Sequence, residues 1–318
     1  MKKNLVAFLL AIAVSGSAVA AGFDTQKRIP LGSITVLTVG NIQADAGVSW
    51  MLEAWIASKR QSPLKALIKV AEPREMSVAF FPESKDRPMY ILAVMAFPKG
   101  VDVDKGRIEA VIKEGGEDVK LETISYKGAA ITYAAKSEER PKDFGAYALF
   151  PDQVVFGSDP DVIKKAIDGP SVADSPNYMK IAKQAAQTSD VLLFADNAAN
   201  QFANFLSPRE KKWSMTLLLS AKYLSYLSVS FDIKDSSKVA GTMILQGADA
   251  NRVSDIKDDA EFIGEAFKRK FLADKIQYSG RVELKDTTVT LTFQVEGLEP
   301  LWKRLFDQGV LELLRPGS

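Results

Sequence analysis

Four prolines that directly follow a capping residue are the strongest constraint on the fold of this chain. They occur in Ser62-Pro63, Asp159-Pro160, Ser175-Pro176 and Ser207-Pro208. The side-chain oxygen of the first residue accepts a backbone N–H that has no partner within the helix. Proline at the first helical position loses nothing by lacking its own N–H. These pairs therefore predict helices over residues 64–71, 162–168 and 178–186, and from residue 209 onward.

Apolar periodicity predicts four more helices, over residues 46–59, 104–114, 254–271 and 299–307. Segments rich in β-branched and aromatic residues predict strands between the helices, at 76–81, 89–97, 120–126 and 130–135. Three hairpins are also expected, each with turn residues between two strand-like segments. Their strands cover 146–150 with 153–157, 223–233 with 239–245, and 279–284 with 289–295.

An internal duplication is predicted from the order of these elements. A capped helix at Ser62 and another at Ser175 are each followed, sixteen residues after the cap, by a strand, at an offset of 113 residues. Each half then ends with a hairpin and a helix. We therefore expect an α+β fold of two related halves, each a mainly antiparallel sheet with packed helices. The halves would span residues 22–170 and 171–318, joined by a linker over 168–175. The alternative is a chance recurrence of common elements.

One segment carries a resemblance to known proteins. Residues 154–168, with the sequence VVFGSDPDVIKKAID, form a strand, a capped turn and an amphipathic helix. This segment resembles one that recurs in exported bacterial proteins of unknown function, which have tandem α+β halves after a signal peptide. The resemblance implies a fold type and a location in the cell envelope. It implies no active-site residues.

The N-terminus has the pattern of a secretory signal peptide, which we assign to residues 1–21. Lys2 and Lys3 precede the apolar stretch 5–14, and Ala18-Val19-Ala20 forms an A-x-A site, so cleavage is expected after Ala20 or Ala21. The stretch is far shorter than the roughly 20 apolar residues that span a bilayer. We expect a periplasmic or secreted protein without a transmembrane segment after cleavage.

Composition excludes several kinds of chemistry. The chain has no cysteine and no histidine, which rules out disulfides, thiolate nucleophiles and sites built on imidazole. Removal of the leader changes the formal net charge from +1 to −1, because Lys2 and Lys3 leave with it. A near-neutral chain without a basic stripe argues against nucleic-acid binding. The glycines of residues 40–47 do not have the spacing of a phosphate-binding loop.

Two short motifs have both a catalytic or metal-binding interpretation and a structural one. Residues 62–65 fit S-x-x-K, but the companion motifs S-D-N and K-T-G do not occur, so we interpret Ser62 as a helix cap. Asp249 and Asn251 begin like a calcium loop, yet Val253 and Ala260 occupy ligand positions. The acidic residues Asp255, Asp258, Asp259 and Glu261 instead match the N-terminus of a helix, where negative charge is stabilising.

The segment 198–226 is the strongest candidate for an apolar surface. Phe202, Phe205 and Leu206 precede basic residues and the apolar run that ends at Leu219. We interpret it as a core-facing helical hairpin, and the alternatives are a membrane-interface segment or an apolar binding groove. The terminal segment with Leu298, Leu301, Trp302, Leu305 and Phe306 is likewise interpreted as a core-facing helix.

These observations favour an exported, non-catalytic envelope protein that acts as a binding or scaffold module, because no motif breaks the local rules of folding as active sites tend to. The partner would be a protein or an apolar ligand. The alternative is a carrier for an apolar ligand such as lipid, held near Phe202, Phe205 and Leu219. A hydrolase that uses serine, lysine or carboxylates is the third hypothesis. No catalytic, cofactor-binding or metal-binding residue is assigned.

Overall fold

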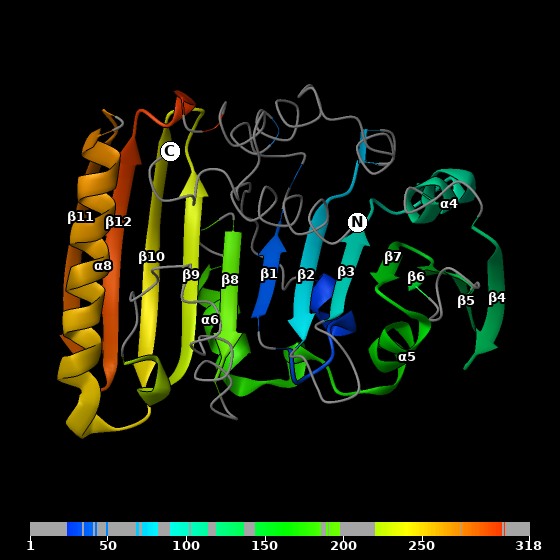
Figure 1. Ribbon diagram of the computed structural model, residues 1–318, viewed down its shortest axis with the longest axis horizontal. Helices are drawn as coiled ribbons and strands as arrows, with labels where there is room; N and C mark the ends of the chain where they lie inside the picture. The colour runs from blue at the N-terminus through cyan, green and yellow to red at the C-terminus, as the bar shows by residue number, and fades with distance from the viewer. Residues whose placement is uncertain are drawn as a thin grey trace.

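The computed structural model describes residues 24–33, 35–40, 42, 49, 68–69, 72–81, 90–101, 103–113, 119–136, 144–185, 189, 191–197, 220–273, 275–300 and 302. These residues form one sheet of twelve strands, in the order β11-β12-β10-β9-β8-β1-β2-β3-β7-β6-β5-β4 (Figure 1). Every pair of neighbouring strands is antiparallel.

The strands are β1 (Thr35–Val39), β2 (Glu75–Phe81), β3 (Tyr90–Ala96), β4 (Leu121–Tyr126), β5 (Ala129–Ala134), β6 (Phe144–Phe150), β7 (Gln153–Gly157), β8 (Val191–Asp196), β9 (Leu224–Ile233), β10 (Lys238–Gly247), β11 (Gln277–Lys285) and β12 (Thr288–Glu296). The helices are α4 (Lys105–Lys113), α5 (Pro160–Asp168), α6 (Pro176–Ala185) and α8 (Val253–Ala273).

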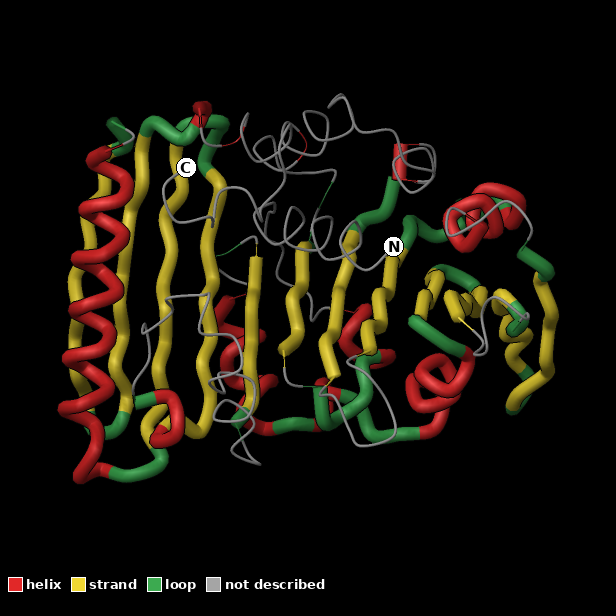
Figure 2. The backbone as a smooth tube through the Cα atoms, in the orientation of Figure 1, coloured by secondary structure: helices red, strands yellow, loops and turns green. Residues whose placement is uncertain are grey.

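Helices cover both faces of this sheet (Figures 1 and 2). Successive residues of a strand point to opposite faces, so each strand contributes to two cores. In β8, Leu192 and Phe194 join the core beneath α5 and α6. On the other face, Val191 belongs to the core beneath α4, and Ala195 to the core beneath α8. Consecutive residues of β1 and β8 are buried and divide between the cores of the two faces, which shows that the centre of the sheet is covered on both faces.

The predicted hairpins and the segment 154–168 are confirmed. The three hairpins are β6–β7, β9–β10 and β11–β12. Asp159 caps α5, because its Oδ1 accepts the N–H groups of Asp161 at 2.9 Å and Val162 at 3.1 Å. Pro160 occupies the first turn of that helix, as the sequence predicts. In β9, Leu227 and Val229 lie opposite Leu245 and Met243 on one face of the sheet.

The prediction of two halves with separate sheets is wrong. The sheet is continuous because β1 pairs with β2 on one side and with β8 on the other. Five residues of β1, from Thr35 to Val39, are in register with both neighbours. The expected linker also takes part in the fold, since the N–H of Leu31 donates to the carbonyl of Pro170 at 2.9 Å. The N–H of Val172 donates to the carbonyl of Ile29 at 2.8 Å.

Several predictions fall outside the described residues, namely the leader 1–21, the Ser62 cap, the helix 46–59 apart from residue 49, and the segment 198–219. Of the terminal helix, Leu298 and Trp302 are described, and both are buried, as predicted. Within the described ranges no helix has both the length and the apolar content needed to cross a bilayer.

A close approach between strands explains one glycine in the sheet. Gly241 of β10 lies opposite Phe231 of β9 and Phe293 of β12. A Cβ atom at Gly241 would lie 2.5 Å from Cζ of Phe293 and 2.7 Å from Cβ of Phe231. The ring of Phe293 therefore occupies the space that a side chain would need. In α8, a Cβ at Gly264 would meet its nearest neighbour, the Tyr278 hydroxyl, at an ordinary 3.5 Å.

We predict opposite effects for alanine at these two glycines. Gly241→Ala should lower the free energy of unfolding by about 1–3 kcal/mol, because the added methyl group overpacks the site. Gly264→Ala should raise it by about 0.5–1 kcal/mol, because alanine favours a helix interior and fits there. Urea unfolding followed by circular dichroism measures both. Equal effects of the two substitutions would contradict this packing around Gly241.

Candidate functional site

A groove with a volume of about 670 Å³ lies on the face of the sheet that α5 covers. Its wall combines the loop before β1, the facing ends of β2 and β3, the end of β4 and the outer side of α5. The lining residues are Pro30, Leu31, Gly32, Phe81, Tyr90, Tyr126, Asp161, Lys164, Lys165, Asp168, Gly169 and Pro170. We refer to this site as the aromatic–lysine groove. Its residues come from parts of the chain separated by up to 140 positions.

Aromatic rings form the apolar part of the groove. Phe81 and Tyr90 lie opposite each other in the register of β2 and β3. Their rings stack with 4.6 Å between centroids and an angle of 8° between planes. Tyr126, the last residue of β4, adds a third ring. Because the strand register fixes where Phe81 and Tyr90 lie, their stacked surface is preorganised before any ligand arrives.

Charged side chains from α5 surround these rings. Lys165 donates from Nζ to the Tyr90 hydroxyl at 2.8 Å and lies 4.9 Å from the centre of that ring. Lys164 pairs with Asp161 at 3.0 Å and lies 5.8 Å from the centre of the Tyr126 ring. The two lysines are adjacent in sequence, yet each reaches a different tyrosine. Cations over aromatic faces are attracted to the electron-rich ring.

Two lining residues of the groove, Tyr126 and Asp168, form a hydrogen-bonded triad with Lys127. Asp168 accepts a hydrogen bond from the Tyr126 hydroxyl and pairs with Nζ of Lys127 at 2.7 Å. Both contacts lower the pKa of Asp168, the ion pair with Lys127 most strongly. The same contacts raise the pKa of Lys127 and that of the Tyr126 hydroxyl. Each group is thereby held in the protonation state that it has at neutral pH.

The sequence indicated only part of this site. The segment 154–168 was singled out as a capped helix, and it supplies Asp161, Lys164, Lys165 and Asp168. The sequence predicts strands for the segments that contain Phe81, Tyr90 and Tyr126, but it does not indicate that these three residues share a site. The signal that they would meet α5 lies in the sheet order, in which β3 pairs with β7 directly before that helix. A single sequence does not reveal that pairing.

A second polar cluster lies beneath the start of the described chain. Glu75 is buried, and its carboxylate accepts hydrogen bonds from the N–H of Asp24 at 3.0 Å and the N–H of Thr25 at 2.9 Å. The Thr25 hydroxyl donates to it as well. The same hydroxyl shares a hydrogen bond of 2.6 Å with Ser77, which in turn contacts the hydroxyl of Thr38 at 2.7 Å. The carboxylate thus anchors the N-terminal turn to the centre of the sheet.

Burial raises the pKa of Glu75, against the opposing effect of the hydrogen bonds from Thr25 and Asp24. The nearby Asp24 carboxylate adds to the increase. The charge of Asp24 is itself paired, with Lys27 at 2.8 Å and with Arg74 at 2.9 Å. The carboxylate oxygens of Glu75 accept hydrogen bonds from Asp24 and Thr25 of the same chain, so we assign Glu75 a structural role.

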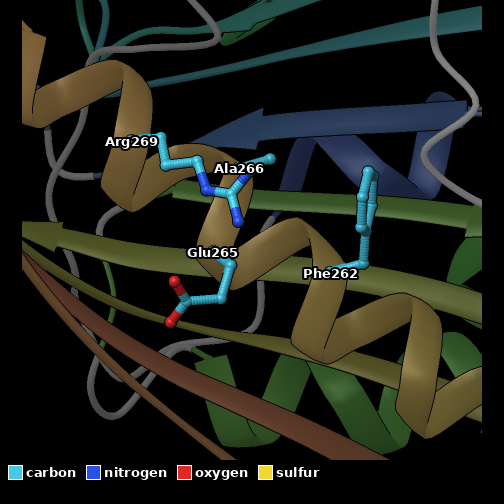
Figure 3. A pocket seen from close by; sticks show the side chains of 4 residues that line it. All are labelled: Phe262, Glu265, Ala266 and Arg269. Carbon is cyan, nitrogen blue, oxygen red and sulfur yellow. The ribbon is translucent and has the colours of Figure 1, made fainter.

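A second hollow, of about 450 Å³, lies beside α8 (Figure 3). The described residues that line it are Phe262, Glu265, Ala266 and Arg269, which arise from successive turns of this one helix. Phe262 is 57% exposed. The described lining of this hollow comes from a single helix, whereas the groove brings together aromatic and charged side chains from β2, β3, β4 and α5, so we take the aromatic–lysine groove as the candidate functional site.

The acidic residues Asp249, before α8, and Asp259, within it, accept hydrogen bonds from neighbouring residues of the chain. Asp249 accepts the N–H of Asn251 at 2.9 Å and so caps a short 3₁₀ helix. Asp259 accepts both the N–H and the hydroxyl of Ser220, at 2.7 and 2.6 Å. In the parts of the chain that the structure describes, no three carboxylates are grouped so that they could hold a metal ion. The S-x-x-K motif of residues 62–65 lies outside those parts.

Comparisons of the chain with protein-family profiles, with curated proteins and with solved structures give no match. The role of the groove must therefore be argued from its own geometry.

The raised pKa of Glu75 predicts how stability changes with pH. The folded protein binds this proton more tightly than the unfolded chain, so this group contributes stability at acidic pH that is lost as the pH rises above about 4.5, its ordinary value. The Glu75→Gln variant does not titrate here. The free energy of unfolding of the wild type minus that of the variant should therefore decrease between pH 4.5 and 7.5.

Urea unfolding at four pH values across this range tests the prediction. Glu261→Gln, at an exposed position of α8, reports the effect of removing a surface carboxylate. A wild-type advantage over Glu75→Gln that grows with pH would show that the buried carboxylate is stabilised in its ionised form.

Proposed function

We propose that this chain is an exported, non-catalytic binding protein of the bacterial cell envelope, and that the aromatic–lysine groove binds its ligand. The observation that carries the proposal is the convergence of three aromatic rings and two lysines from separate elements on one concave surface. Ligand sites commonly combine apolar surface with a few placed polar groups in volumes of about 300–1,000 Å³. Export is supported by the leader-like residues 1–21.

The charges of the groove favour an uncharged polar ligand. Lys164 is paired with Asp161, and Lys127 with Asp168, so most of the positive charge is neutralised locally. The paired groups still offer hydrogen-bond donors and acceptors around the aromatic surface. A molecule with a flat apolar face and hydroxyl groups at its rim matches this arrangement. We therefore propose a sugar ring of a neutral glycan as the ligand.

The protonation states in the groove support a binding role over a catalytic one. A general acid or base works best when its pKa lies near the operating pH. Here the pKa of Asp168 is lowered and those of Tyr126 and Lys127 are raised, which moves all three away from neutrality. These groups are suited to hold fixed hydrogen bonds rather than to exchange protons during a reaction.

Isothermal titration of the mature protein with chitotetraose and maltotetraose tests this function. We expect binding of at least one of these neutral glycans, weakened about tenfold by Tyr126→Ala, because the ring surface and its hydrogen-bonding partner are lost. Lys165→Ala should weaken it by a smaller factor. Lys222→Ala is a matched control, because Lys222 lies 4.9 Å from the ring of Tyr223, the distance at which Lys165 lies from Tyr90.

Loss of affinity in the two groove variants, with Lys222→Ala unchanged, is the expected result. Binding that survives Tyr126→Ala would place the ligand elsewhere. If neither glycan binds, the proposed ligand class is wrong.

A further inference from the structure

Strand β11 forms an edge of the sheet with nothing described beyond it. It stands last in the strand order and pairs with β12 alone (Figures 1 and 2). Most of its side chains are exposed; those of Arg281 and Glu283 are 81% and 59% accessible and form an ion pair with each other at 3.0 Å. An edge strand of nine residues presents unpaired backbone groups that another strand can complete.

The hairpin turn determines which backbone groups face this open edge. Lys285 pairs with Thr288 across a two-residue turn, and such a closing pair exchanges both of its hydrogen bonds. Hydrogen-bonded and non-hydrogen-bonded pairs then alternate along the strands. The N–H and C=O groups of Gly280, Val282 and Leu284 therefore point away from β12. They form a regular row of donors and acceptors along the edge.

We propose that β11 pairs antiparallel with β11 of a second copy of this chain, around a two-fold axis at Val282. The register joins residues 279–285 of the two copies. Residues opposite each other in an antiparallel pair lie on the same face of the sheet. Arg281 then lies opposite the partner's Glu283, and Glu283 opposite the partner's Arg281. The strand is complementary in charge to itself in this register.

The apolar face of β11 fits the same register. Leu284 is 41% exposed, and in the dimer it lies opposite the partner's Gly280. The position of Gly280 has no side chain, and the phenol of Tyr278 lies over it, with its hydroxyl 2.5 Å from where a Cβ would be. The exposed leucine would therefore pack against the phenol that lies over this glycine. The pairing of Arg281 with Glu283 and the packing of Leu284 beside Tyr278 both favour the register with its axis at Val282.

Neighbouring registers are less favourable. An axis at Arg281 would place this residue opposite its own copy, and an axis at Glu283 would do the same for the carboxylate. Like charges that face each other across strands are destabilising. An axis at Gly280 leaves Arg281 opposite a serine, without an ion pair. An axis at Leu284 runs into the turn at Asp286, which shortens the ladder.

A charge swap tests the proposal. Sedimentation velocity of the purified mature protein should show a concentration-dependent dimer. Arg281→Glu and Glu283→Arg should each raise its dissociation constant by about tenfold or more, because each puts two pairs of like charges in opposition. The double variant R281E/E283R restores opposite charges and should recover the wild-type value within about threefold. Lys120→Glu, beside the opposite edge strand β4, is the matched control and should leave the dimer unchanged.

The outcomes separate clearly. A monomer at all concentrations overturns the proposal, and so does a dimer that neither single swap weakens. Failure of the double variant to restore association overturns the register. Thermal unfolding of each variant should stay close to the wild type, because the ion pair between Arg281 and Glu283 within the strand is exposed and such pairs add little stability.

A single cysteine gives an independent test, because the chain has none of its own. In this register the two copies of Val282 lie opposite each other, at a Cα separation near 5.5 Å, within the range of a disulfide. Val282→Cys should form a covalent dimer with oxidised glutathione as the oxidant. Ser279→Cys, which faces the partner's Lys285, should not. Equal crosslinking of both variants contradicts the axis at Val282.

Discussion

A strand inside a sheet needs hydrogen-bond partners for its backbone along both edges. Strand β1 provides such partners to β2 on one side and to β8 on the other, where the strands from the two ends of the sheet meet. Its five residues bind β2 through one edge and β8 through the other. Without β1, the strands β2 and β8 would each present an open edge among apolar side chains. One short strand thus turns two groups of strands into a continuous sheet, and the cores on both faces extend across it.

The N-terminal turn is attached to this same centre by polar contacts. Glu75 on β2 holds the N–H groups of Asp24 and Thr25, and the hydroxyls of Ser77 and Thr38 continue the network toward β1. A buried polar network stabilises one arrangement only when all its members are satisfied. The turn is therefore fixed in position, and the loop that follows it supplies Pro30 and Leu31 to the wall of the groove.

Local patterns predicted the hairpins and the capped helix α5, because caps, turns and β-branched segments act within a few residues. The continuity of the sheet was not predicted. Residues 35–39, with the sequence TVLTV, are a short β-branched run that could have been assigned to a strand, but nothing local shows that it lies between β2 and β8. The groove was missed for the same reason. Tyr90, Tyr126 and Lys165 meet only through strand order, and a single sequence does not encode that order in any local signal.

The position of the groove relative to the β11 edge has a consequence for binding. The groove lies where β2, β3 and β4 meet α5, and many strands separate it from β11. In a dimer joined edge to edge, the two-fold axis at the joint is perpendicular to the sheet, so both copies keep the same face on the same side there. The two grooves would remain unobstructed by the joint. A glycan chain long enough to span both grooves would gain affinity from the second contact, whereas a ligand too short to span them would bind each groove independently.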